Sequence, residues 1–223
     1  MSKATIKTKF HKDTFDNIPE SKRDKIIAAA IEEFADKGLD NSKIDNIAKK
    51  AGISYGSMYN YFTSKDDLIH TIIRIGFDIQ REVLITGMMK SGAFERIESI
   101  LHLSQKVAFE NPGIISLWLE MSFSHNERFS NHLFEMEAEG TSVWKEIIND
   151  GKKAGEIPAD VDTDAAAYIL DSIVANIMKA HISDHEMKKI VNDFPGSDIA
   201  KGEHIDSLMP LIKSILGRGS SRK

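Results

Sequence analysis

Residues 42–65 constrain the fold of this chain more than any other stretch. The first half of the stretch carries apolar residues at the i, i+3, i+4, i+7 spacing of one buried helical face: Ile44, Ile47, Ala48 and Ala51. Gly52 follows at once, and a helix that ends in a left-handed residue is easiest to build where no Cβ is present. The pattern predicts a helix over 44–51 that stops in a tight turn.

A second, short helix is expected from Tyr55 to Phe62, with the Ser54 hydroxyl as its cap, and Ser54 is also counted among the DNA contacts. Met58 and Phe62 are expected to face the core. The other positions carry small or hydrogen-bonding side chains that are expected to face outward: Tyr55, Gly56, Ser57, Tyr59 and Asn60. Such a helix fits the DNA major groove, which admits a helix and presents donors and acceptors on the base edges.

Two further groups suit the DNA backbone. The hydroxyl of Tyr59 stands at the edge of the short helix, where it suits a phosphate. Lys65 follows Ser64 at the start of the next helix, and the amide donors and positive dipole end of a helix start attract anions. We therefore expect both side chains to contact phosphate.

The stretch resembles the signature of the TetR-type transcriptional repressors. The resemblance is carried by Ile47-Ala48, then by the run from Ala51 to Phe62, and then by Lys65-Asp66-Asp67-Leu68. Similarity at the level of motifs covers residues 21–70, and the remainder resembles the family in length and helix pattern alone. The alternative is a helical hairpin in an ordinary all-α domain, but several independent features here agree in register.

The resemblance implies an all-α fold with an N-terminal three-helix helix-turn-helix DNA-binding domain and a larger C-terminal helical domain for ligand binding and dimerisation. It also implies a homodimer that binds double-stranded operator DNA and responds to an unknown small-molecule effector. The expected parts are a flexible basic arm, the DNA-binding domain, the helical domain and a flexible tail, over 1–18, 19–66, 67–216 and 217–223. The arm either follows the DNA backbone or is a solubilising tail.

Further backbone contacts follow from the resemblance. In related proteins the start of the first helix touches phosphate, which implies this role for Lys22 and Arg23. Asn41 or Ser42 is expected to cap the 44–51 helix, and Ser42 is counted among the DNA contacts. The family usually has threonine or serine where this chain has Lys43, so a hydroxyl contact is replaced by a charged one.

Long segments of 3.6-residue periodicity predict further helices at 64–90, 93–110, 114–123, 127–151, from Thr163 onward, and at 204–216. Thr163 is expected to cap the helix that follows it. The first is longer than a three-helix head needs, so its second half is expected in the larger domain. By resemblance, the final two long helices pair with their copies in a second subunit. The local pattern alone leaves open whether their apolar stripes bury against another chain or their own.

Composition limits the class of function. The chain has 223 residues, of which 41% are hydrophobic and 28% charged, as in soluble globular proteins, and it has no cysteine for disulfides or thiolate chemistry. No signal-peptide pattern and no apolar run of about 20 residues is present, so a cytoplasmic protein without a membrane partner is expected. The P-loop, dinucleotide and nucleophile-elbow motifs are absent, so neither enzymatic activity nor a cofactor is expected.

The net charge of −5 is unevenly divided. Residues 1–75 hold 13 Lys+Arg and 11 Asp+Glu, whereas residues 76–223 hold 16 and 23. The balance is therefore +2 for the part that contains the motif and −7 for the rest. This division favours contact between the N-terminal part and DNA.

The central helices are rich in aromatic residues and methionine, which either form a plain core or line an apolar effector pocket. Taken singly, each residue is explained by a core. As a group, in a chain that resembles ligand-responsive repressors, they are the candidate ligand-binding residues: Trp118, Met121, Phe123, Phe129, Phe134 and Trp144.

His181 and His185 are four residues apart with Asp184 between them, and this spacing suits a metal if all three lie on one helix. The sequence places no third ligand, and a solvated pair or a pair at a dimer edge is favoured, so no metal site is expected.

Together these patterns predict a DNA-binding transcriptional regulator, a repressor that a small apolar ligand releases from a pseudo-palindromic operator. The alternative is a helical small-molecule-binding protein without sequence-specific DNA binding. Regulation by activation instead of repression also stays open.

Overall fold

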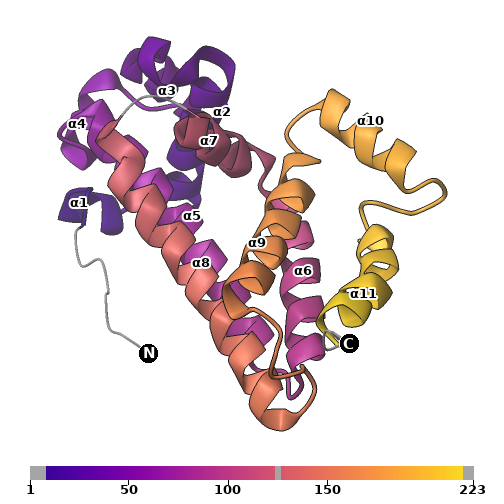
Figure 1. Cartoon of the computed structure of the whole chain (residues 1–223). Helices are drawn as coiled ribbons and strands as arrows, with labels where there is room; N and C mark the ends of the chain where they lie inside the picture. Colours follow the sequence, from indigo (N-terminus) through magenta and orange to yellow (C-terminus); the bar gives the residue numbers. More distant parts are fainter. Residues whose placement is uncertain (1–8, 124–126, 218–223) are drawn as a thin grey trace. The chain divides into compact units, whose positions relative to one another are not determined.

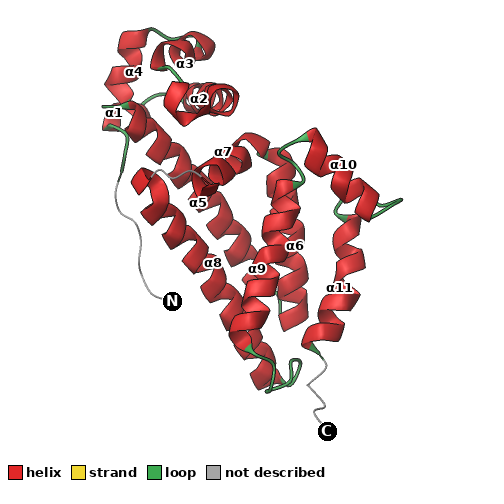
Figure 2. Cartoon of the chain, turned by 45° about the horizontal axis from the view of Figure 1, so that its top comes forward, coloured by secondary structure: helices red, strands yellow, loops and turns green. Residues whose placement is uncertain are grey.

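The computed structural model describes residues 9–123 and 127–217, and over these ranges the regular structure is helical, with no strand (Figure 2). The all-α fold class is therefore confirmed. In chain order the helices are α1 (Asp13–Asp16), α2 (Glu20–Asn41), α3 (Ile44–Ala51), α4 (Tyr55–Tyr61), α5 (Lys65–Met88), α6 (Ala93–Glu110), α7 (Pro112–Phe123), α8 (Glu127–Ala154), α9 (Thr163–Lys179), α10 (Asp184–Asp193) and α11 (Glu203–Leu216). None of these described helices has the length and apolar character that a membrane span requires.

The chain divides into two compact units, whose helices are labelled in Figure 1. Unit 1 comprises Met1–Gly76 and Leu117–Ser124, and unit 2 comprises Phe77–Ser116 and His125–Lys223. The division falls inside α5, as the expected length of that helix implied. The sequence did not indicate that the end of α7 belongs with the N-terminal unit.

Unit 1 is organised around a small apolar core that several helices share. Its largest fully buried side chains come from α2, α3, α4 and α5, with one from the residue that ends α4: Ile26, Phe34, Ile47, Met58, Leu68 and Phe62. Burying a side chain of this size contributes about 1.5–3 kcal/mol. The short helices α3 and α4 are thus held in place by packing, because helices of this length are marginal by themselves.

The turn between α3 and α4 has the predicted chemistry. Gly52 has φ 70° and ψ 32°, the left-handed conformation, and its N–H donates to the carbonyls of Ala48 and Lys49. The Ser54 hydroxyl then accepts from the Ser57 N–H at 3.1 Å and caps α4. Both predictions for this turn are confirmed.

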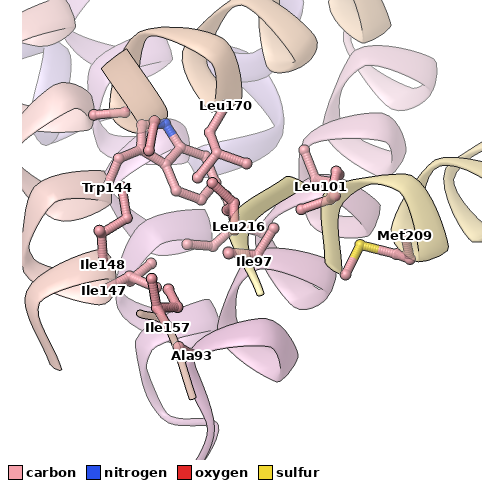
Figure 3. Packing of buried hydrophobic residues seen from close by; sticks show 14 of the residues in the cluster. Ala93, Ile97, Leu101, Trp144, Ile147, Ile148, Ile157, Leu170, Met209 and Leu216 are labelled. Atoms are coloured by element: carbon pink, nitrogen blue, oxygen red, sulfur yellow. The ribbon is translucent and has the colours of Figure 1, made fainter. Parts of the chain in front are cut away.

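Unit 2 is a helical bundle in which α9 packs against α8 and α6, and α11 packs against α6. Its core is gathered around Trp144, whose side chain is almost completely buried. Figure 3 shows the indole against Leu170, with Ile147 and Ile148 of the same helix and Ile97 of α6 nearby. Because α6, α8, α9 and α11 all contribute to one cluster, none of them moves without repacking the others.

Several local predictions are wrong. Thr163 does not cap α9, because Asp162 accepts the N–H groups of Asp164 and Ala165 instead. Neither Asn41 nor Ser42 caps α3, whose N-cap is Lys43, without a side-chain cap hydrogen bond.

The described part of the expected flexible arm, residues 9–18, is folded. It contains α1, and Phe15 is buried against the rings of Tyr61 and Phe62, with centroids 5.8 Å and 4.8 Å away. A single aromatic anchor cannot produce a periodic pattern, which is why the sequence suggested an arm. Residues 1–8 of the expected arm and 218–223 of the expected tail lie outside the described ranges.

Candidate nucleic-acid interface

The outward face of α4 carries the side chains expected to face bases. Tyr55 is 50% and Tyr59 41% exposed, Gly56 has open space beside it, and Asn60 is exposed. Ser57 is half-buried, and its hydroxyl lies 2.8 Å from that of Ser54. These residues form one exposed surface made of small and hydrogen-bonding groups.

The two tyrosines on this surface are joined to each other. The Tyr55 and Tyr59 hydroxyl oxygens lie 2.8 Å apart, and the rings meet edge to face with centroids 5.0 Å apart. The hydrogen bond to Tyr59 raises the pKa of the Tyr55 phenol above its usual value, which favours the uncharged Tyr55 hydroxyl. A neutral pair of hydroxyls can donate to a phosphate or a base edge and can accept as well.

The opposite face of α4 is packed. Met58 and Tyr61 on α4 and the adjoining Phe62 are all buried, so the helix cannot rotate without opening the core of unit 1. The sequence identified Met58 and Phe62 as core residues and missed Tyr61. The Tyr61 ring also contacts Phe15 of α1, and no local sequence pattern predicted this contact.

The C-terminal end of α4 is held by Lys12, which precedes α1, and by Thr14 of α1. The Lys12 N–H donates to the Tyr61 carbonyl at 2.8 Å, and the Lys12 ammonium donates to the Tyr59 carbonyl at 2.6 Å. The Thr14 hydroxyl donates to the Asn60 carbonyl. These three carbonyls belong to the last turn of the helix, which has no intrahelical donors for them, and the lysine charge opposes the negative end of the dipole.

A buried carboxylate joins α2 to α3. The Glu33 side chain is only 2% exposed and accepts from the Asn46 amide at 2.7 Å and from the Lys43 N–H at 3.4 Å. Lys50 adds an ion pair at 3.4 Å. The Asn46 hydrogen bond, followed by the Lys43 N–H and Lys50, holds the pKa of Glu33 below its usual value despite burial. Glu33 thus fastens the start of α3 to α2.

Lys65 and Ser42 are engaged inside unit 1. The Lys65 ammonium donates to the carbonyls of Leu39, Asp40 and Ser42 at 2.7, 3.0 and 3.2 Å. The Ser42 side chain is buried, and its hydroxyl donates to the Leu39 carbonyl at 2.8 Å. An ammonium has three protons, so all of those on Lys65 are used by the turn that follows α2.

The remaining candidate cations lie near the surface. Lys43 is exposed, and Lys22 is half-buried with its ammonium 5.7 Å from the centre of the Tyr61 ring. Arg23 is half-buried and donates from one terminal nitrogen to the carbonyls of Asp16 and Ile18 at 2.9 and 3.1 Å. A guanidinium has five donors, so Arg23 keeps others for a phosphate.

The candidate ligand-binding residues are not brought together as one set. Trp118 and Met121 belong to unit 1, whereas Phe134 and Trp144 belong to unit 2. Phe134 is 72% exposed, and Trp144 is a core residue of the bundle. The side chains of Phe123 and Phe129 lie outside the described part of the chain.

The expected histidine pair is also separated. Helix α9 ends at Lys179 and α10 begins at Asp184, so His181 lies in the turn between them and His185 lies on α10. The two imidazoles therefore do not share one helical face.

Comparison with known proteins agrees with the geometry of unit 1. The model of the family described as bacterial regulatory proteins, tetR family, matches residues 26–72, from the middle of α2 into α5. The HTH-type transcriptional repressor KstR2 of Rhodococcus jostii is 28% identical over 157 residues, which cover 67% of this chain and 74% of that protein.

Solved structures extend the likeness to almost the whole chain. The transcriptional regulator FadR of Bacillus subtilis, solved with stearoyl-CoA, superposes with a TM-score of 0.67 at 20% identity, and the match covers 86% of this chain and 98% of that chain. AibR, solved with isovaleryl coenzyme A and operator DNA, gives a TM-score of 0.66 at 15% identity with the same coverage. The helix-turn-helix segment of this chain, residues 26–72, thus matches the tetR family of bacterial regulatory proteins, and the chain shares its all-helical fold with these solved regulators.

Proposed function

We propose that this chain is a homodimeric repressor that binds a pseudo-palindromic operator through unit 1 and is released by a small apolar effector. Each copy of α4 enters a major groove, and the two half-sites are separated by about 34–36 Å or a multiple of that distance. The observation that carries the proposal is the face of α4. It is exposed and small or hydrogen-bonding along its length, whereas the opposite face is locked into a core.

The contacts divide into two kinds. Tyr55, Gly56, Ser57 and Asn60 face bases, and an asparagine is suited to a bidentate contact with adenine. Lys22, Arg23, Lys43 and Tyr59 face phosphates, which position the protein without reading sequence. Ser54 caps α4 and so supports the contacts of Ser57.

Ser42 and Lys65 act differently from the expectation based on sequence. Their polar groups are hydrogen-bonded to the turn that links α2 and α3, so we assign them to positioning α3 and not to phosphate contact.

The effector class that we propose to test first is an acyl-coenzyme A thioester. Support comes from the two fold neighbours that were solved with stearoyl-CoA and isovaleryl coenzyme A. Helices α5 and α7 each run from one unit into the other, so they are the covalent routes by which a ligand in unit 2 changes unit 1. The ligand shifts operator occupancy only by its difference in affinity for the free and the DNA-bound protein.

The test begins with selection of bound genomic fragments by the purified full chain, followed by binding titrations on the recovered site. Specific binding should exceed binding to random duplex by about 10³-fold or more at physiological salt. Asn60→Ala should lower the preference for one base pair, whereas Lys43→Ala should weaken binding to all sequences alike. Equal affinity for the recovered site and random duplex would leave the alternative, a helical small-molecule-binding protein.

The release step has its own measurement. Stearoyl-CoA and isovaleryl coenzyme A are titrated against the free protein and against the protein–operator complex. A weaker affinity for the complex is expected for the effector class. Equal affinities in both states for all thioesters would reject this class and leave operator binding untouched.

A further inference from the structure

A small cluster of metal-ligating side chains lies in unit 2, on helices that carry none of the proposed DNA contacts. Glu98 and His102 are one turn apart on α6, and Asp206 lies in the first turns of α11, which packs against α6. One ligand atom from each of the three lies within 4.8 Å of the other two. The cluster therefore joins two helices through one imidazole and two carboxylates.

The geometry suits a shared cation. His102 Nε2 lies 3.0 Å from Asp206 Oδ1. Two neighbouring ligands of an octahedral ion, each at about 2.1 Å from it, also lie about 3.0 Å apart, so a cation can replace the hydrogen bond without moving either helix. A set of one nitrogen and two oxygen ligands is typical of zinc or manganese, whereas magnesium and calcium prefer oxygen alone.

The start of α11 is shaped to approach His102. Gly202, the N-cap of α11, has φ 78°, and a Cβ built there would come within 2.9 Å of His102 Nδ1. A side chain at this position would push the imidazole away from Asp206.

A second feature beside the cluster points to a ligand. His204, two residues before Asp206, is completely buried, and neither of its ring nitrogens has a hydrogen-bond partner among the described residues. Its electrostatic neighbours include the His102 ring and the Asp206 carboxylate. Buried polar groups without a partner are rare and commonly mark ion or water sites.

We propose that Glu98, His102 and Asp206 bind a divalent cation of the zinc or manganese class and that the ion fastens α11 to α6. The site lies on helices that carry none of the proposed DNA contacts. Failure of the cation proposal would therefore leave the operator-binding proposal unchanged, and the reverse also holds.

The test uses the untagged full chain, freed of metal with a chelator and titrated with Co²⁺, whose visible absorption reports ligation. Wild-type protein should take up one equivalent per chain. Separate His102→Gln and Asp206→Asn substitutions should each weaken Co²⁺ binding by at least about tenfold. Even the loss of a residue that only contacts a metal ligand commonly lowers metal affinity about 10–100-fold. His185→Gln is the matched control, since this exposed histidine lies on α10, outside the cluster, and should leave the titration unchanged.

Competition and stability complete the experiment. Zn²⁺ should displace Co²⁺ at a similar concentration, Mn²⁺ should do so in excess, and Mg²⁺ at the same excess should not. Zn²⁺ should raise the Tm of the wild type by several degrees and that of His102→Gln by much less, with circular dichroism confirming that the variants are folded. The proposal is overturned by an absence of Co²⁺ absorption up to about 1 mM, by equal binding in wild type and His102→Gln, or by equal loss in His185→Gln.

Discussion

At the residue scale, the two lysines that lie before α3 and after α4 offer a matched pair. Lys43 is exposed at the N-cap of α3, whereas the Lys65 ammonium donates hydrogen bonds to three carbonyls. We expect Lys43→Met to make the plot of log operator-binding constant against log salt concentration less steep by about one unit, because one phosphate contact is lost. Lys65→Met should weaken operator binding with an unchanged slope and lower the free energy of unfolding by about 1–3 kcal/mol.

Operator titrations at several salt concentrations and urea denaturation of both variants make this comparison. If Lys65→Met instead makes the salt dependence of operator binding less steep and leaves the free energy of unfolding unchanged, Lys65 contacts phosphate, as its position in the sequence suggested.

The buried Glu33 carboxylate gives a prediction about pH. Its pKa is lower in the folded protein than in the unfolded chain, chiefly because of the Asn46 hydrogen bond. Its stabilising contribution is therefore fully present above the unfolded pKa of about 4.3 and is lost as the pH falls through the folded value. Glu33→Gln should be less stable than wild type by about 2 kcal/mol at pH 7. The difference should shrink below about pH 4, and denaturation midpoints measured across pH 3–7 test it.

The same experiment has a control in Glu32→Gln. Glu32 is exposed and pairs with Lys50 at 2.8 Å, and exposed pairs contribute little. A pH dependence shared equally by both variants would show that the net charge of unit 1, and not the buried network, is responsible.

At the scale of elements, the contacts that Lys12 and Thr14 make with the end of α4 predict that the segment of residues 9–16 strengthens operator binding. Helix α4 has only 7 residues, and its last carbonyls are satisfied by Lys12 and Thr14. Lys12→Met with Thr14→Val should fray the end of α4 and weaken operator binding about tenfold, with faster amide exchange at Tyr61 and Phe62. Gel-shift titration and hydrogen exchange measure the two effects.

Lys9→Met is the matched control, because it removes one positive charge from the same segment but breaks pairs with Asp13 and Asp16 only. If Lys9→Met weakens the operator complex as much as the double substitution does, the segment acts through its charge and not by holding α4.

Helices with a continuous apolar face were predictable from the sequence, whereas elements fixed by single contacts were not. The expected helix over 93–110 matches α6, because its apolar residues repeat over several turns. Helix α1 has one buried side chain, Phe15, and α10 has none, so neither gives a periodic signal. The capping pair of Ser183 and Glu186 was the one local signal for α10.

The candidate DNA-binding site was likewise predictable only in part. The spacing of Met58 and Phe62 predicted which face of α4 is exposed. The partners of Lys65 did not, since its acceptors are carbonyls of a turn that lies 23–26 residues earlier in the chain. Hydrogen bonds between segments far apart in the chain cannot be predicted from local sequence patterns.

At the scale of the whole molecule, the proposed operator geometry requires a second copy. On α11, Leu211 is 56% and Ile215 50% exposed, and on α9 Tyr168 and Ile169 are exposed as well. Apolar side chains at one-turn spacing on the surface of two helices mark an interface more often than a free surface. We expect Leu211→Glu with Ile215→Glu to convert the dimer into a folded monomer, because burying two carboxylates opposite their own copies is strongly unfavourable.

The monomer should lose most of its operator affinity, because the second half-site then no longer adds to binding within the same complex. Sedimentation velocity gives the oligomeric state, and titration on one half-site against the full operator separates a loss of pairing from a loss of the DNA-binding surface. Val191→Glu, at an exposed apolar residue of α10, serves as the control and should remain dimeric. A double variant that still sediments as a dimer would place the interface on other elements. A monomer with full affinity for the whole operator would show that one copy of α4 reads the site alone.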